Sequence, residues 1–152
     1  CLGALDAWLV IRGIKTLPLR MEQHQKNAFA IAKWLQEQPR VQYVLYPGLE
    51  NHPGYEINKA QTTGFGGMIS FAVDSAETAR QILEGVKLIK FAESLGGTES
   101  LITYPIRQTH TDLTAEECAE KGITDCLLRF STGIEATQDL IDDLAQAFAA
   151  VK

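Results

Sequence analysis

The sequence has little of several features that would point to a function by themselves. Its three cysteines, Cys1, Cys118 and Cys126, show no paired spacing. Such an odd, sparse set argues against a disulfide framework and predicts reduced thiols in a cytoplasmic protein, each packed as a small apolar residue. No apolar run approaches the roughly 20 residues of a membrane span, and we expect no signal peptide.

Basic charge and metal ligands are also scarce. The chain has a net charge of −5 and no basic stripe, which argues against nucleic acid as its main partner. His24, His52 and His110 lie far apart and lack the close cysteine or acidic companions of a metal site. We therefore expect no metal, and we expect His24 to be a surface or half-buried residue of a helix.

What is present fits one ordinary domain. The 152 residues are 45% hydrophobic and 22% charged, which is typical of a globular protein with a real core. The first residue is Cys1 and not methionine, and a helical pattern is already under way at Trp8 and Val10. These features favour a piece of a longer polypeptide.

Two helices are predicted at the start of the chain. The first is the apolar stretch from Leu2 to Ile11, ended by Gly13. The second should run from Thr16 as N-cap, with Pro18 in its first turn, to about Gln38. Its expected buried stripe has apolar residues at helical spacing: Leu17, Met21, Ala28, Ile31 and Leu35.

The remaining pattern alternates strands with helices. Strands are predicted at 41–46, at 67–73, at 88–91 and in the segment that begins at Cys126. Capping-box spacing at Asp74–Glu77 and Thr114–Glu117 predicts two helix starts, and a last helix should begin near Thr137. The segment 51–63 is turn-rich, and 92–112 is read as a loop. The order predicts an α+β (α/β) sandwich, with helices on a sheet of three to five strands.

Two glycine-rich segments invite a phosphate-binding interpretation. A strand follows Gly64–Gly67, so the helix N-terminus that would bind an anion is missing, and the glycines are expected to turn the backbone into the sheet. In Ser94–Gly97, successive amides beside a hydroxyl can form a small anion-binding nest. The alternative for Ser94–Gly97 is a plain loop.

Arg129 is a permanent charge within a predicted apolar strand. Burying a guanidinium is costly unless an anion meets its planar fork. One interpretation is an internal ion pair with Glu99 or Glu135; the other is a bidentate clamp on a substrate carboxylate. No nucleophile–base pair is visible, so the residues themselves indicate a carboxylate-binding domain without its own catalyst.

Five ordered motifs carry a resemblance over nearly the whole chain. They are Arg12–Met21, Glu93–Gly97, Thr98–Ile102, Gln108–His110 and Gly122–Glu135. Together they resemble the C-terminal part of the trans-sulfuration (Cys/Met metabolism) enzymes that use pyridoxal phosphate. The resemblance implies the small domain of a fold-type I enzyme, with a mixed or antiparallel sheet covered by helices. It assigns 1–38 to the end of the large domain and a connecting helix, and 39–152 to the substrate-binding domain.

The resemblance also implies roles for four residues. Arg129 occupies the position of the arginine that binds the α-carboxylate, Ser94 matches a residue that helps to hold it, and Thr109 matches an active-site threonine. Glu93 before that serine is typical of the cystathionine γ-synthase and γ-lyase branch, where it faces an amino group of cystathionine or cysteine. Its alternative is a solvated loop carboxylate.

The family's cofactor domain and its Schiff-base lysine have no match in this sequence. The resemblance therefore implies pyridoxal 5'-phosphate in the full-length enzyme, with no catalytic or cofactor-binding residue in this chain, which alone should be inactive. It also implies the chain's own N-terminal domain as partner, a homotetramer, and cystathionine, O-acylhomoserine or cysteine as substrate. Cystathionine β-lyase, O-acylhomoserine sulfhydrylase and a stand-alone binding or assembly module are the alternatives.

Overall fold

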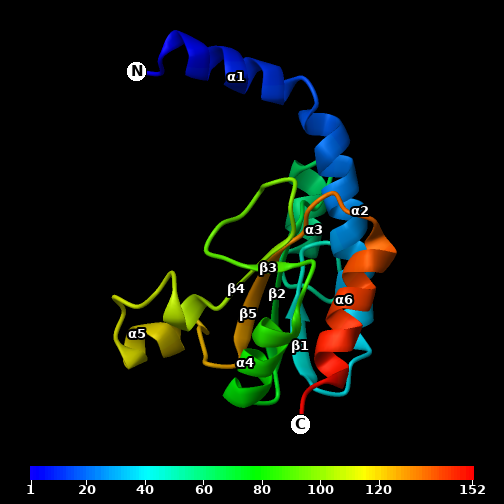
Figure 1. Ribbon diagram of the computed structural model, residues 1–152, viewed down its shortest axis with the longest axis vertical. Coiled ribbons are helices and arrows are strands. Elements are labelled where there is room, and N and C mark those ends of the chain that lie inside the picture. Colours follow the sequence, from blue (N-terminus) through cyan, green and yellow to red (C-terminus); the bar gives the residue numbers. More distant parts are fainter.

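The computed structural model describes residues 1–152 as six helices, a 3-10 turn and one five-stranded sheet (Figure 1). The elements in chain order are α1 (Ala4–Ile14), α2 (Leu17–Gln36), β1 (Val41–Leu45), α3 (Tyr55–Gln61), β2 (Met68–Val73), α4 (Ala76–Gly85), β3 (Lys90–Phe91), β4 (Leu101–Thr103), η1 (Pro105–Arg107), α5 (Ala115–Glu120), β5 (Leu127–Ser131) and α6 (Thr137–Ala149).

The sheet has the strand order β1-β2-β5-β4-β3, with β5 in the centre. Antiparallel pairing joins β1 to β2, β2 to β5 and β5 to β4, whereas β3 and β4 pair in parallel. The sheet is therefore mixed, and the prediction of a small mixed or antiparallel sheet is confirmed.

One face of the sheet is covered by α2, α4 and α6, which pack against one another and against the strands (Figure 1). Alternate residues of β5, Leu128 and Phe130, point into this layer and are fully buried. From α2, the predicted core residues Ala28, Ile31 and Leu35 meet them in one core cluster. The domain is thus a two-layer α+β sandwich, as the sequence predicts.

The beginning of the chain does not join this core. α1 runs away from the sheet in Figure 1 and has no buried residue. The first turns of α2 are equally uncovered, since Leu17 and Met21 are about two-fifths exposed. The prediction that these two residues belong to a buried stripe was wrong: the spacing marks an apolar face, but no element of this chain covers its first half.

Helix starts differ from the predictions in detail. The capping box at Thr114 and Glu117 is confirmed, with both reciprocal hydrogen bonds present. At α4 the cap is Ser75 and not Asp74, because the Ser75 hydroxyl accepts the Thr78 N–H at 3.0 Å. Thr16 precedes α2 as predicted, but its side chain makes no capping hydrogen bond.

Two buried polar residues fix the chain on the helix side of the sheet. Tyr46, at the end of β1, donates its hydroxyl to Gly66 O at 3.0 Å, and burial raises its pKa to about 12. Asp143 of α6 accepts the backbone N–H groups of three successive residues, 87–89. Because charge-assisted hydrogen bonds to backbone amides are strong, Asp143 sets where β3 begins.

The prediction for His24 was wrong. Its ring is buried, with 3% exposure, and Nδ1 donates to Thr132 O at 2.5 Å. The Thr132 hydroxyl in turn donates to His24 O at 3.0 Å. This exchange ties α2 to the chain just after β5, which explains why a polar ring is tolerated in the interior.

Candidate functional site

Arg129 lies at the centre of the sheet, on the face opposite to α2, α4 and α6. Its neighbours in the strand, Leu128 and Phe130, point into the core, so the arginine side chain points the other way. Ser70 of β2 and Thr103 of β4 are its direct partners across the sheet. The guanidinium therefore lies over the middle of the sheet, on the side away from the helix layer.

The Arg129 side chain is half-buried, yet it has no anionic partner. The three ion pairs of the chain are Arg40–Asp74, Arg80–Glu77 and Arg80–Glu84, all at the surface. Arg129 Nε is buried and makes no hydrogen bond, the only buried side-chain nitrogen or oxygen in this state. A buried donor without an acceptor costs about 1–3 kcal/mol, more when it is charged.

The internal ion-pair interpretation of Arg129 was wrong. Glu135 accepts the Ser100 N–H at 2.7 Å and the Ser100 hydroxyl at 2.9 Å. Glu99 is exposed and accepts only a long hydrogen bond from Thr98, at 3.4 Å. Both carboxylates therefore act on the segment before β4 and leave the guanidinium free.

The loop between β3 and β4 carries two of the predicted site residues, Glu93 and Ser94. Both side chains are exposed, and neither makes a hydrogen bond. Their position follows from the backbone on each side: Thr103 Oγ1 donates to Ala92 O at 2.9 Å, and Gly96 N donates to Ser131 Oγ at 2.9 Å. The segment thus spans between two residues that lie next to Arg129 in the sheet.

Backbone geometry at two glycines allows this loop to lie where it does. Gly96 has φ +76°, the left-handed region that side chains disfavour. Gly133, just after β5, approaches the Thr98–Glu99 backbone so closely that a Cβ would collide with it. Ile134 N also donates to Thr98 O at 2.9 Å. Replacing Gly133 would push the Thr98–Glu99 backbone away from the strand end, whereas replacing Gly96 would strain its left-handed backbone without a clash.

Thr109, the third predicted substrate-binding residue, is not joined to the others by a hydrogen bond. It lies beyond η1, half-buried, and its hydroxyl is 2.7 Å from His110 Nδ1. The loop that carries Glu93 and Ser94 is therefore anchored beside Arg129. The Thr109 hydroxyl contacts only the adjacent His110.

Two ionisable groups beside the strands around Arg129 have raised pKa values. Burial raises the pKa of Tyr104, and the nearby Asp125 carboxylate raises it further. Burial likewise raises the pKa of the Cys126 thiol, which donates to Asp125. Both groups stay protonated at neutral pH.

No group of three His, Cys, Asp or Glu side chains is placed to hold a metal ion. All eight lysines of the sequence are exposed.

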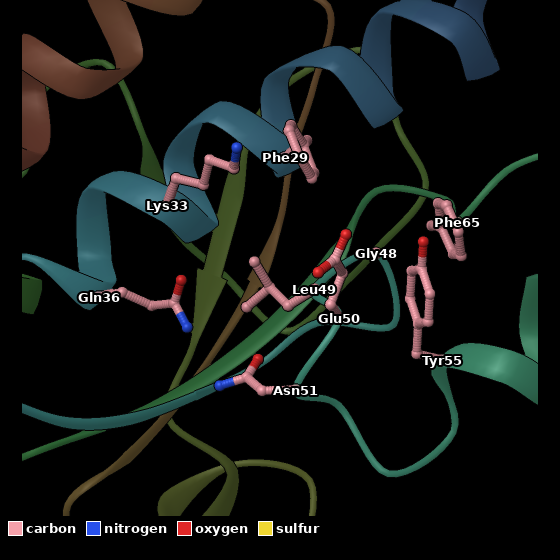
Figure 2. Close-up of a pocket in the computed structure, with 9 residues that line it drawn as sticks. All are labelled: Phe29, Lys33, Gln36, Gly48, Leu49, Glu50, Asn51, Tyr55 and Phe65. Atoms are coloured by element: carbon pink, nitrogen blue, oxygen red, sulfur yellow. The ribbon is translucent and has the colours of Figure 1, made fainter.

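A cavity of about 550 Å³ lies elsewhere, between α2 and the turn after β1. Figure 2 shows Phe29 and Lys33 projecting from α2 on one side, and Tyr55 with Phe65 on the other. The two rings of that second pair stack with centroids 5.5 Å apart. None of the predicted site residues lines this cavity. The cavity and the Arg129 site are therefore in different parts of the molecule.

Two polar residues that hold the loop, Thr103 and Ser131, were missed in the sequence, and Glu135 was expected to meet Arg129 and not Ser100. Ser131 is two positions from Arg129 and therefore on the same face of β5. That spacing is a signal that could have found it. The contacts of Thr103 and Glu135 are with residues 11 and 35 positions away, which no local pattern reveals.

Fold and site together define a mixed-sheet α+β domain with an unpaired arginine on the face of the sheet opposite to its helix layer. The chain belongs to the Cys/Met metabolism PLP-dependent enzyme family, which matches residues 1–149. The family uses pyridoxal phosphate, and the resemblance seen in the five motifs is confirmed.

Individual relatives agree with this assignment. The chain is 52% identical over 146 residues to a cystathionine γ-lyase of Bacillus subtilis (96% of this chain, 38% of the relative). It is 51% identical over 151 residues to a cystathionine γ-synthase of Haemophilus influenzae (99% and 37%). Cystathionine β-lyases also occur among the matches, so identity leaves the type of reaction open.

The fold is likewise that of solved enzymes of this kind. A cystathionine γ-lyase of Lactobacillus plantarum, crystallised with L-serine, superposes with a TM-score of 0.94 at 41% identity, over 99% of this chain and 39% of that one. The chain spans about two-fifths of the length of these relatives. None of its helices combines the length and apolar character that a membrane crossing requires.

Proposed function

We propose that this chain is the substrate-binding small domain of a pyridoxal-phosphate-dependent trans-sulfuration enzyme of the cystathionine γ-synthase or γ-lyase type. In it, Arg129 binds the α-carboxylate of the amino-acid substrate. The observation that carries this is the buried Arg129 Nε without an acceptor. A carboxylate supplies two oxygens in the geometry of the guanidinium fork. The relative solved with L-serine supports a ligand that is an amino acid.

The placement of Arg129 gives it an orienting role. It is on the central strand of the sheet, and hydrogen bonds to β2 and β4 hold the backbone of that strand on both sides. A bidentate contact fixes the direction of the carboxylate as well as its position, and the rest of the substrate then points in one direction. Ser94, held beside the strand by its loop, adds a hydroxyl donor to the same anion.

Glu93 adjoins this site and carries the proposed selectivity. Its carboxylate is exposed and free of any ion pair. An amino group at the far end of cystathionine, or that of an incoming cysteine, would find in it a counter-charge. Thr109 is proposed as a further contact of the substrate. Among the alternative functions, an O-acylhomoserine sulfhydrylase would need Glu93 least, because its second substrate is a thiol without an amino group.

The uncovered beginning of the chain supports the proposed division into parts. Residues 1–38 would end the cofactor domain and connect it to residues 39–152. Seven large apolar residues of the first stretch are about half or more exposed: Leu2, Leu5, Trp8, Leu9, Val10, Ile11 and Ile14. Such a patch marks an interaction surface. We propose that the cofactor domain covers it and supplies the lysine that holds the cofactor.

The experiment that tests the proposal uses a chimera. In it, this chain replaces the matching segment of the B. subtilis cystathionine γ-lyase, and cystathionine turnover is measured. Arg129→Lys should raise KM about tenfold or more, because a point charge replaces the fork. Arg40→Lys, at an exposed ion pair, is the matched control and should leave KM unchanged. An unchanged KM for Arg129→Lys would remove the carboxylate role.

Selectivity is tested in the same chimera with Glu93→Gln. The loss in kcat/KM should be greater with cystathionine than with an amino acid that has a single amino group, since only the former meets the Glu93 charge. Equal losses with both substrates would remove the role of Glu93.

Two rival functions give different products. A β-lyase would release pyruvate from cystathionine, whereas γ-elimination releases a four-carbon 2-oxo acid, and the two are separated by chromatography. A stand-alone binding module would leave the chimera inactive even with Arg129 intact. The 152-residue chain alone, given pyridoxal phosphate and cystathionine, is expected to show no turnover.

A further inference from the structure

Two hydroxyl groups flank Arg129 in the sheet, and both hold the same loop. Thr103 is the direct partner of Arg129 on β4, so their Cα atoms are about 5 Å apart. Ser131 is two residues along β5, about 7 Å away. Thr103 is 1% exposed and Ser131 3% exposed. Both hydroxyls are hydrogen-bonded to backbone groups of one segment, Ala92–Gly96.

The two anchors leave the segment little freedom. Thr103 fixes its first residue through Ala92 O, and Ser131 fixes its last through Gly96 N. Four residue steps reach about 14 Å at most, so Glu93 and Ser94 cannot leave the neighbourhood of the guanidinium while both hydrogen bonds persist. Beyond Gly96, Ser100 is held separately by Glu135.

We propose that Thr103 and Ser131 are positioning residues for the substrate site. They act through the loop: their hydroxyls set Ser94 and Glu93 beside Arg129 without touching the substrate. The inference rests on the proposed function, because it presumes that Arg129 binds the carboxylate. The substrate carboxylate is bound equally in the ground state and in the transition state. Loss of the anchors should therefore weaken both states alike, which raises KM more than it lowers kcat.

The first test concerns the loop alone and does not depend on the function. In the 152-residue chain, hydrogen exchange of the Gly96 amide should become at least tenfold faster in Ser131→Ala, which removes its acceptor. Ser70→Ala is the matched control, because Ser70 lies on the same face of the sheet and makes no hydrogen bond to the loop. An unchanged Gly96 exchange rate in Ser131→Ala would overturn the anchor.

The second test is kinetic, in the chimera with cystathionine. Ser131→Ala and Thr103→Val should each raise KM about fivefold or more and change kcat less than twofold. Thr103→Ser keeps the hydroxyl and should restore the parent KM, which a merely structural role would not require. Ser75→Ala is the matched control. It removes a serine hydroxyl that also accepts a backbone N–H, at the start of α4, and should leave KM unchanged.

The outcomes separate the two proposals. If Arg129→Lys raises KM but Ser131→Ala and Thr103→Val do not, the positioning role is overturned and the carboxylate role stands. If Thr103→Ser is as impaired as Thr103→Val, packing and not the hydroxyl matters, and the positioning role is again overturned. If Arg129→Lys has no effect, both proposals fall.

Discussion

The two faces of the central strand behave in opposite ways. Leu128 and Phe130 point into the helix layer and have no exposed surface, whereas Arg129 between them points to the opposite face and keeps a buried donor unpaired. The core side is complete in this chain: its apolar residues form one cluster and its polar groups are bonded. The other side has one buried donor, Arg129 Nε, without an acceptor in this chain. Burial on the core face fixes the strand, and we propose that the acceptor of Arg129 is the carboxylate of a substrate.

The largest effect that would test this contrast is expected on the core face. Leu128→Ala should lower the free energy of unfolding by about 3 kcal/mol, through lost burial and the cavity left behind. Leu45→Ala makes the same change at a residue that is 42% exposed, on the open face of β1, and should cost less than about 1 kcal/mol. Urea denaturation of the 152-residue chain measures both. Equal losses would mean that the two faces are not distinct.

A smaller effect of the opposite sign is expected one residue away. Arg129→Leu should raise the free energy of unfolding by about 1 kcal/mol, because it removes a buried donor that has no partner. Arg107→Leu, at an exposed arginine, should stay within about 0.5 kcal/mol of the parent chain. The same denaturation experiment applies. A clear loss of stability in Arg129→Leu would show that the guanidinium already has a structural role.

The smallest effect concerns a charge that is already paired. Hydrogen bonds from Arg80 and then Gln81 lower the pKa of Glu77 to about 2. A carboxylate whose pKa is lower in the folded state stabilises the fold above its unfolded pKa of about 4.5 and loses this contribution as the pH falls toward 2. Glu77→Gln should therefore flatten the fall in stability over this window. An identical pH profile for parent and variant would refute the pairing.

Much of the fold could be predicted because local pattern and burial agree. The strands β1 and β2, the capping box at Thr114 and the buried half of α2 follow from spacing alone. β4 was missed because Leu101–Thr103 is too short to show a period. The exposure of Leu17 could not be predicted, since periodicity identifies an apolar face but not what covers it. The segment 51–63, expected to be turn-rich, contains the helix α3.

The site was predicted less completely than the fold. The sequence predicts that Arg129 needs an anion, because a charge in an apolar strand is costly without one. It could not predict that Glu135 does not pair with Arg129, because the Glu135 carboxylate accepts hydrogen bonds from Ser100, 35 residues away. Nor could the loop anchors Thr103 and Ser131, which depend on how β3 and β4 pair.

The most direct test of the central claim is a crystal structure of the chimera with a bound amino acid such as L-serine. The expected result is a substrate carboxylate with its oxygens about 2.7–2.9 Å from Arg129 Nε and a terminal nitrogen of the same guanidinium. A carboxylate bound elsewhere, with Arg129 paired instead to an acidic side chain of the cofactor domain, would contradict it.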